Sequence, residues 1–208
     1  MLVVSIVSMT AFDPRTLGFY ASEAADYAAR SPGGIGRHLE PFLERLPAGA
    51  RILELGCGSG RDAAQMEARG FRVDATDGVA EMAAQAAARL GRAVRVMRFD
   101  ELSAEAEYDG IVAAYSLLHV PRAGLPDVLH RIWRALKPGG WHAATYKSGG
   151  TEGRDRLGRY YNYPTEPELR SLYAAAGPWA AIETETGEGR GYEGGVSTFV
   201  AILLRKAG

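Results

Sequence analysis

The sequence predicts an α/β domain with a mostly parallel seven-stranded sheet, helices on both of its faces and an antiparallel strand at the C-terminal edge. Short apolar segments alternate with amphipathic segments, which is typical of a parallel sheet covered on both faces. The last two apolar segments follow one another without a helix between them, so they predict an antiparallel pair. The length of 208 residues, with 47% hydrophobic and 24% charged residues, fits one globular domain over residues 1–208.

The predicted strands are short apolar runs bounded by turn residues. The fourth run is nearly continuous in apolar residues, as expected for a strand that is buried on both faces. Several glycines separate the last two runs and predict a hairpin loop there. In chain order the predicted strands are residues 51–55, 71–76, 93–99, 108–115, 141–146, 179–186 and 196–204.

The predicted helices follow the 3.6-residue period. Pro32-Gly33-Gly34 separates the first two, Pro47-Ala48-Gly49 ends the second, and Lys137-Pro138-Gly139-Gly140 ends the fifth. Thr165, with Glu168 three residues later, predicts a capping box at the start of the sixth. In chain order the predicted helices are residues 22–30, 36–46, 61–69, 79–90, 122–136 and 166–176.

Charge and cysteine content limit the partners and the compartment. The formal net charge is -1, so no bulk positive field favours nucleic acid, and a nucleic-acid partner is not expected. Cys57 is the one cysteine, which excludes an internal disulfide or a cysteine-rich metal site and fits the reducing cytoplasm. Residues 1–12 are apolar but too short to cross a bilayer; we expect a disordered or surface-tucked leader, with Met9 as an alternative start, and no membrane partner.

A glycine-rich segment, Glu54-Leu-Gly-Cys-Gly-Ser-Gly60, follows the first predicted strand and opens a helix. Glycines at such a turn let a ligand approach the backbone closely. A dinucleotide fingerprint, G-x-G-x-x-G, would need its third glycine at Arg61. The carboxylate of Glu54 would also repel a pyrophosphate. The loop therefore favours a ligand that is cationic and carries no phosphate.

An acidic residue followed by x-Gly-x-Gly-x-Gly after the first strand resembles the class I S-adenosylmethionine-dependent methyltransferases. The resemblance extends from about Tyr20 to the C-terminus and implies a Rossmann-like fold with S-adenosyl-L-methionine as the cofactor. Gly-Cys-Gly-Ser-Gly-Arg-Asp62 and Asp74-x-x-Asp77 are similar to the tellurite-resistance-type, small-molecule branch. The resemblance implies that the cofactor is bound by Glu54, Gly56, Cys57, Gly58 and Gly60.

Acidic residues also end the second and third predicted strands. The carboxylate of Asp77, followed by Gly78, can accept hydrogen bonds from both ribose hydroxyls of a nucleoside. Asp77 is also a candidate helix N-cap, and the two roles can coexist. The resemblance implies that Asp100 accepts a bond from the adenine amino group and that the Glu101 amide contacts the ring. Alternatively, Asp100 only caps a turn.

The segment after the fourth strand, Ala113-Ala-Tyr-Ser-Leu-Leu-His-Val-Pro121, lacks the Asn/Asp-Pro-Pro-aromatic run of the related DNA and protein amide methyltransferases. His119 is a candidate general base, because its ordinary pKa lies near neutrality, or it only supports the loop. Tyr115 is expected on the cofactor's wall. The resemblance implies a helical lid over residues 20–47, in which Tyr27 covers the cofactor and Tyr20 contacts the substrate; exposed tyrosines on an entry helix are the alternative.

The segment after the fifth strand is rich in arginine and tyrosine. Guanidinium groups match carboxylates and oxyanions, so this loop is a candidate clamp for an anionic acceptor and is expected to be mobile without it. A solvated loop is the alternative. The residues proposed to bind the acceptor here are Arg154, Arg156, Arg159 and Tyr160.

The sequence thus predicts methyl transfer from S-adenosylmethionine to a small molecule, with no metal site. Alignment of the nucleophile with the methyl carbon supplies most of the catalysis in such a reaction, so no single side chain is diagnostic. A non-catalytic S-adenosylmethionine-binding module is an alternative. A NAD-dependent oxidoreductase is a weaker one, because Glu54 and Arg61 disagree with a dinucleotide loop.

Overall fold

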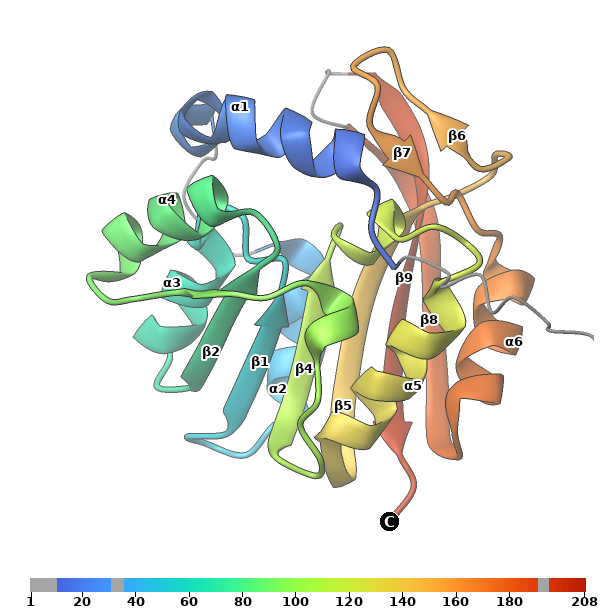
Figure 1. Cartoon of the computed structure of the whole chain (residues 1–208). Coiled ribbons are helices and arrows are strands. Elements are labelled where there is room, and N and C mark those ends of the chain that lie inside the picture. The colour runs from blue at the N-terminus through green and yellow to red at the C-terminus, as the bar shows by residue number, and fades with distance from the viewer. Residues whose placement is uncertain (1–10, 31–35, 191–194) are drawn as a thin grey trace, which may run out of the picture.

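The computed structural model of the chain describes residues 11–30, 36–190 and 195–208. Its centre is a seven-stranded sheet in the order β3-β2-β1-β4-β5-β9-β8 (Figure 1). Strands β1 to β5 are mutually parallel, and β9 is antiparallel to both β5 and β8. The strands are β1 (Arg51–Leu55), β2 (Arg72–Asp77), β3 (Arg95–Val96), β4 (Tyr108–Ala114), β5 (Leu136–Lys147), β8 (Trp179–Arg190) and β9 (Val196–Lys206). The predicted fold class is confirmed.

Helices cover both faces of the sheet, and one helix crosses its end. On one face lie α2 (Glu40–Glu44), α3 (Arg61–Ala68) and α4 (Ala80–Leu90), and on the other α5 (Leu125–Ala135) and α6 (Glu166–Ala176). Helix α1 (Pro14–Arg30) lies across the carboxyl ends of the parallel strands and packs beside α4 (Figure 1). Short 3-10 turns complete the chain: η1 (Arg37–Leu39), η2 (Phe99–Glu101) and η3 (Leu117–His119).

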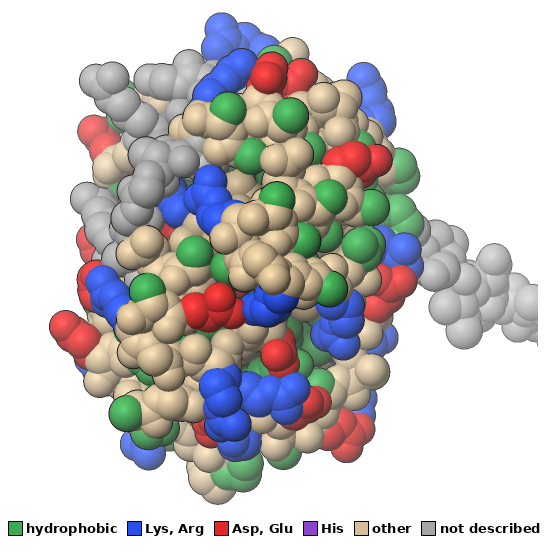
Figure 2. All heavy atoms as spheres, turned by 90° about the vertical axis from the view of Figure 1, so that its left-hand side faces the viewer, with side chains coloured by type: hydrophobic (Ala, Val, Ile, Leu, Met, Phe, Trp, Pro, Cys, Tyr) green, Lys and Arg blue, Asp and Glu red, His purple; other side chains and the backbone are tan. Residues whose placement is uncertain are grey.

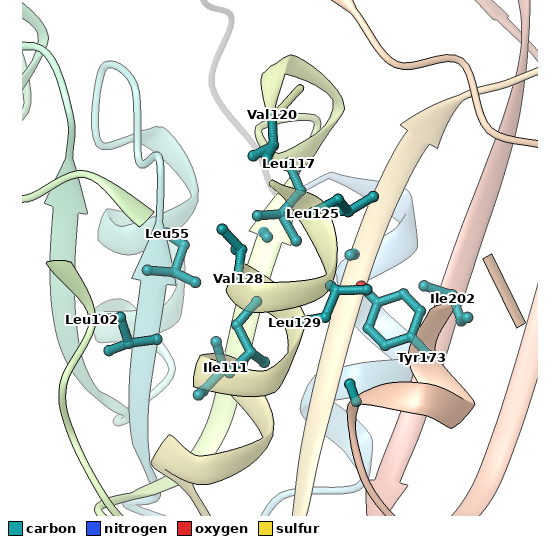
Figure 3. Packing of buried hydrophobic residues seen from close by; sticks show 14 of the residues in the cluster. Leu55, Leu102, Ile111, Leu117, Val120, Leu125, Val128, Leu129, Tyr173 and Ile202 are labelled. Atoms are coloured by element: carbon teal, nitrogen blue, oxygen red, sulfur yellow. The ribbon is translucent and has the colours of Figure 1, made fainter. Parts of the chain in front are cut away.

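The alternation of side chains along β1 divides the core into two layers. Leu53 and Leu55 face α5 and join the larger cluster, whereas Ile52 faces α2 and α3. Figure 3 shows Val128 and Leu129 of α5 packed over the face of the sheet that carries Leu53 and Leu55. Glu54 shares the face of Ile52 because the pleat has a period of two, so this carboxylate points into a covered layer.

A buried polar chain joins α6 to the sheet. Nδ1–H of His142 donates to the carbonyl of Ile111 at 2.9 Å, so its Nε2 accepts the hydroxyl hydrogen of Tyr173 at 2.9 Å. The hydroxyl of Tyr146 then donates to Tyr173 at 3.0 Å. All these side chains are fully buried, and burial lowers the pKa of His142 to about 4, so its imidazole is neutral.

Several element boundaries differ from the sequence prediction. The first helix begins at Pro14 rather than at residue 22, because Asp13 caps it by accepting a bond from the Thr16 amide at 2.8 Å. The predicted helix 36–46 is only η1 followed by α2, and the predicted strand 93–99 is only β3. Strand β5 begins at Leu136 and passes through residues 137–140 with a register shift, where the sequence predicted a turn.

Part of the predicted leader is ordered. Ala11 is buried in the larger core cluster, and Phe12 lies under the guanidinium of Arg98 at 4.8 Å. The rest of the leader, with Met9, and the predicted break at residues 32–34 lie outside the described residues. The capping box of Thr165 and Glu168 is confirmed at the start of α6.

The surface carries both signs of charge. On the face formed by α3, α4 and the β2–β3 edge, acidic and basic side chains are interspersed (Figure 2). Arg92, for example, donates to Glu67, and Arg69 donates to Glu40. Among the described residues, no helix is both long and apolar enough to cross a membrane.

The buried chain of His142, Tyr173 and Tyr146 leads to a stability prediction. Tyr173→Phe leaves the imidazole Nε2 and the Tyr146 hydroxyl without partners in a dry site, which should lower the free energy of unfolding by about 1–3 kcal/mol. Urea denaturation followed by circular dichroism measures this loss. An unchanged urea midpoint would show that these buried hydrogen bonds contribute nothing to stability.

Candidate cofactor and acceptor site

The glycine loop turns at the carboxyl end of β1, beneath α1. Gly56, Gly58 and Gly60 have φ of 74°, 57° and 73°, a left-handed conformation that strongly favours glycine. Close packing also excludes a side chain at Gly56, because a Cβ there would lie 2.5 Å from Cβ of Ser116. The sequence pattern is therefore required by the local backbone before any ligand is considered.

The end of β2 holds this loop in place. The amides of Gly56 and Cys57 both donate to the carbonyl of Thr76, at 2.9 and 2.8 Å. The amide of Gly58 donates to Oδ2 of Asp77 at 2.9 Å, and the amide of Val79 donates to Oδ1 at 2.9 Å. One carboxylate thus ties the loop to the turn that leads into α4.

Asp77 is buried, and burial raises its pKa to about 6 despite the backbone amides that donate to it. Asp77 does not occupy the N-cap position of α4, which is Val79. Its carboxylate instead accepts a hydrogen bond from the amide of Val79. Asp77 also lines the pocket beneath α1, where a ribose can reach its remaining lone pairs. Gly78 lines the same pocket.

Glu54 carries a buried oxygen that has no partner among the described residues. Its Oε2 makes no hydrogen bond, although the side chain is almost fully buried beside the glycine loop. Burial, with the nearby Asp62 and Asp77, raises the pKa of Glu54 well above its ordinary value. An unsatisfied buried carboxyl costs free energy, which a cationic ligand group placed here would recover.

Helix α1, whose second half falls within the lid predicted over residues 20–47, covers the loop. A Cβ built on Gly58 would lie 3.5 Å from Cε1 of Tyr27 and 3.6 Å from Cε of Met82. The space above this backbone is thus narrow and aromatic. Ala24 of α1 packs with Met82 of α4 in a small apolar cluster that holds the lid against the sheet.

Two connected pockets lie under the lid. The first extends over the ends of β1, β2 and β4, and the second extends from the glycine loop to the ends of β5 and β9. The residues common to both form a waist, which consists of Tyr20, Tyr27, Gly56, Gly58, Ala114, Tyr115 and His119. Tyr115 stands at this waist with φ of 54°, a strained conformation for a tyrosine and one typical of functional sites.

The third predicted acid does not face either pocket. Asp100 accepts a hydrogen bond from Nε of Arg98 at 3.2 Å, and Glu101 accepts from the Arg98 amide at 2.7 Å. The wall of the first pocket is instead made by Arg98 and Phe99. The alternative in which Asp100 serves a local turn agrees with this geometry, because its carboxylate bonds to Arg98 just before η2.

His119 lies at the waist with both ring nitrogens hydrogen-bonded. Its Nδ1–H donates to the carbonyl of Tyr160 at 2.6 Å, so Nε2 accepts from the hydroxyl of Tyr20 at 2.9 Å. Burial lowers the pKa of His119 to about 4. The arrangement favours the supporting role over the general-base role, because its one acceptor nitrogen already holds the Tyr20 hydroxyl.

The arginine- and tyrosine-rich segment is a small hairpin rather than an open loop. Strands β6 (Gly153–Arg154) and β7 (Tyr160–Tyr161) pair with each other and pack on α1. Arg154 forms an ion pair with Asp13 at 2.6 Å, and the amide of Tyr160 donates to Oγ1 of Thr16 at 2.8 Å. The hairpin thereby adds to the lid.

The predicted clamp residues are not brought together. Arg154 and Arg156 line neither pocket, and the Tyr160 hydroxyl donates to Glu152. Arg159 does line the second pocket, but it is almost fully buried and forms an ion pair with Asp155 at 2.6 Å. Its Nη1 donates to the Tyr20 hydroxyl at 3.2 Å. Arg159 therefore positions Tyr20 directly, whereas its charge is balanced by Asp155.

Sequence reasoning missed several lining residues. Lys147 ends β5 and lines the second pocket, with Nζ 4.3 Å from the centre of the Tyr161 ring. The rule that ligands lie at the carboxyl ends of parallel strands could have found Lys147. Phe199 of β9 belongs to the antiparallel edge, where that rule gives no signal.

Comparisons with known proteins agree with this geometry. Residues 52–140 match the methyltransferase-domain family. The chain is 36% identical over 126 residues to the S-adenosyl-L-methionine-dependent Diels-Alderase iccD of Talaromyces variabilis, a match that covers 53% of this chain and 42% of that protein. The fold, the glycine loop and the matched segment are similar to those of the class I S-adenosylmethionine-dependent methyltransferases.

Two solved structures are similar over most of their length. A Methanosarcina mazei S-adenosylmethionine-dependent methyltransferase superposes with a TM-score of 0.73 at 19% identity, covering 81% of this chain and 97% of the other. The Burkholderia thailandensis 1,6-didemethyltoxoflavin-N1-methyltransferase, with bound 1,6-didemethyltoxoflavin and S-adenosylhomocysteine, superposes at 0.70 and 25% identity, covering 93% and 88%. S-adenosylmethionine is thus the cofactor that the class and the site indicate.

The narrow space above the loop leads to a binding prediction. Gly58→Val places a branched side chain between Tyr27 and Met82. The added methyl groups would occupy ligand space above the loop, and a loss of about 1–3 kcal/mol corresponds to about ten- to hundredfold weaker binding of S-adenosylhomocysteine, which calorimetry measures. Gly91→Val is the matched control, because Gly91 has φ of 66° but nothing within 4 Å of its Cβ. Equal affinity of the two variants would remove Gly58 from the site.

The burial of Asp77 leads to a pH prediction. Ribose hydroxyls donate to the ionised carboxylate, so cofactor affinity should hold above about pH 6 and fall below it, by up to about tenfold per pH unit. Asp77→Asn should lose this part of the pH dependence of cofactor affinity. We assign any pH dependence that remains in the variant to Glu54. Identical pH profiles for the wild type and Asp77→Asn would contradict the assignment. Asp77→Asn keeps an acceptor for one of the two backbone amides, of Gly58 or of Val79, whereas an alanine variant would remove the acceptors of both.

Proposed function

We propose that the protein transfers the methyl group of S-adenosylmethionine to a small molecule bound in the second pocket. The observation that carries the proposal is the buried, unpartnered oxygen of Glu54 beside a glycine loop, which suits a cationic and not a phosphate-bearing ligand. When bound, S-adenosylmethionine supplies an electrophilic methyl carbon, whose transfer breaks the carbon–sulfur bond with the electron pair staying on sulfur.

The chain's own residues divide this work along the two pockets. Asp77, Gly78 and Phe99 would hold the nucleoside, and Glu54 with the glycine loop would hold the ammonium end. Tyr115 and Tyr27 form the waist between the two regions. The lid excludes water and aligns the acceptor, and alignment alone can supply about 7–11 kcal/mol.

A second candidate function is S-adenosylmethionine-dependent cyclisation without methyl transfer. The relative from Talaromyces variabilis, which is named a Diels-Alderase, motivates it. The neutral His119, with both nitrogens bonded, fits a reaction that moves no proton. A NAD-dependent oxidoreductase is disfavoured, because a pyrophosphate would lie against Glu54. The matched segment spans only 42% of the Talaromyces variabilis Diels-Alderase, so the match alone does not assign cyclisation activity to this chain.

The acceptor is expected to be the partner, rather than nucleic acid or a membrane. The two pockets form a covered chamber beneath α1, which suits a small molecule better than a duplex. With one buried cysteine among the described residues, we assign the enzyme to the cytoplasm.

Ligand titrations and product analysis test the proposal. S-adenosylmethionine should bind and NAD should not, and Glu54→Gln should weaken S-adenosylmethionine binding about tenfold or more by removing the charge while keeping the shape. Glu67→Gln, on the outer face of α3, is the control and should bind normally. Screening acceptors by release of S-adenosylhomocysteine identifies transfer. Unchanged affinity of Glu54→Gln would refute the assignment, and a converted but unmethylated substrate would favour cyclisation.

A further inference from the structure

A third pocket, which we call the sheet groove, lies beside the second pocket on the face of the sheet that carries α2. His38, Leu39 and Pro41 of η1 and α2 form its roof, and strands β4, β5, β9 and β8 form its floor. Among the described residues that line it, only Ala114 also lines a pocket beneath α1. The groove is therefore a separate hollow that the proposed methyl transfer does not use.

The strand register places the floor of the groove next to the floor of the second pocket. Two rows of paired residues cross the groove, namely Val112, Ala143 and Leu203, and then Ala114, Thr145 and Ala201. In the next row towards the carboxyl ends of the parallel strands, Lys147 lies opposite Phe199, and both line the second pocket. Residues two apart on a strand share a face and lie about 7 Å apart. The two floors are thus consecutive parts of one surface.

Ala114 and His38 lie at the boundary between the groove and the second pocket. Ala114 is the last residue of β4 and lines both hollows with a side chain of one methyl group. The centre of the His38 ring lies 4.5 Å from that of Phe199 and 6.4 Å from that of Tyr115, two aromatic residues that line the second pocket. His38 thus stands where the two hollows meet, and Ala114 keeps the floor low enough there for a narrow chain to pass.

The two acidic side chains of the groove have basic neighbours. Oε1 of Glu183 accepts a hydrogen bond from Nη1 of Arg45 at 2.8 Å, and Oε2 of Glu185 lies 3.5 Å from Nδ1 of His38. Both acids belong to β8, at the outer side of the groove. An apolar ligand leaves these contacts intact and covers the alanine and leucine side chains of the floor, which favours its binding. The groove therefore suits an uncharged, apolar occupant.

From this arrangement we propose that the sheet groove binds an apolar tail of the acceptor, whose reacting head lies in the second pocket. The acceptor is then an elongated molecule with an alkyl chain on its head group. The inference rests on the proposed function and deepens it by naming the substrate class. Ala201, in the middle of the floor, determines how long a tail fits, and no bond forms or breaks in the groove.

A series of neutral probes tests the inference without turnover. The full chain is saturated with S-adenosylhomocysteine and titrated by calorimetry with 4-alkylbenzyl alcohols whose tails have one to six carbons. Wild-type affinity should rise about fourfold with each methylene group that is buried. Ala201→Phe fills the floor, so the six-carbon probe should bind about tenfold or more weakly than to the wild type, and the one-carbon probe equally well. Affinity for S-adenosylhomocysteine should stay unchanged, because Ala201 lines neither pocket beneath α1.

Matched variants isolate the groove. Ala180→Phe adds the same side chain at an exposed position of β8 outside the groove and should bind every probe as the wild type does. Ala201→Val suits a strand and should weaken the six-carbon probe about threefold, which keeps the test valid if Ala201→Phe does not fold. An affinity independent of tail length, no effect of either Ala201 variant, an equal loss in Ala180→Phe, or no probe binding overturns the inference. The proposed function fails separately, if S-adenosylhomocysteine itself does not bind.

Discussion

The buried carboxylate of Asp77 is the contact on which the rest of the site depends. Each of its oxygens accepts a backbone amide, one from Gly58 in the glycine loop and one from Val79 before α4. The loop after β1 and the turn after β2 are therefore held as one surface. The same carboxylate lines the pocket in which we propose that the cofactor binds, so a single group would serve both the loop geometry and the ligand. Burial raises the pKa of Asp77 to about 6, because desolvation disfavours the charged form.

A second layer of contacts builds the lid over that surface. Asp13 caps α1 and pairs with Arg154 of the hairpin, and Thr16 accepts a bond from the Tyr160 amide. Arg159 and His119 fix the hydroxyl of Tyr20 from two sides. The lid is thus a composite of the N-terminal helix and the β6–β7 hairpin, although well over a hundred residues separate them in the chain. The hairpin and α1 are therefore held together by direct contacts above the two pockets.

Charged side chains line the second pocket at both ends. Glu54, Asp62, Arg30 and Arg61 lie near the glycine loop, and Lys147 and Arg159 line the opposite end. Arg159 shows why residue type alone misleads, because its charge is balanced by Asp155 and its main contact is with Tyr20. Lys147, by contrast, lines the pocket from the end of β5, with its ammonium group over the Tyr161 ring.

Much of the fold and the cofactor side was predictable from the sequence, because those features are local. The glycines at 56, 58 and 60 are required by backbone dihedrals, and the α6 capping box closes within four residues. Alternating strands and helices determined the parallel sheet and placed the loops at its carboxyl edge. The first strand and the sixth predicted helix match the structure at both ends.

The acceptor side was decided by tertiary contacts. Which way Asp100 turns depends on Arg98, and whether Arg154 meets a ligand depends on Asp13, far away in the chain. The supporting role of His119 is favoured only by tertiary contacts, because Tyr20 and the Tyr160 carbonyl occupy its two nitrogens. A sequence states which charges and hydrogen-bonding groups exist, but their pairing is set by long-range packing. That pairing decides which groups are left to face the ligand.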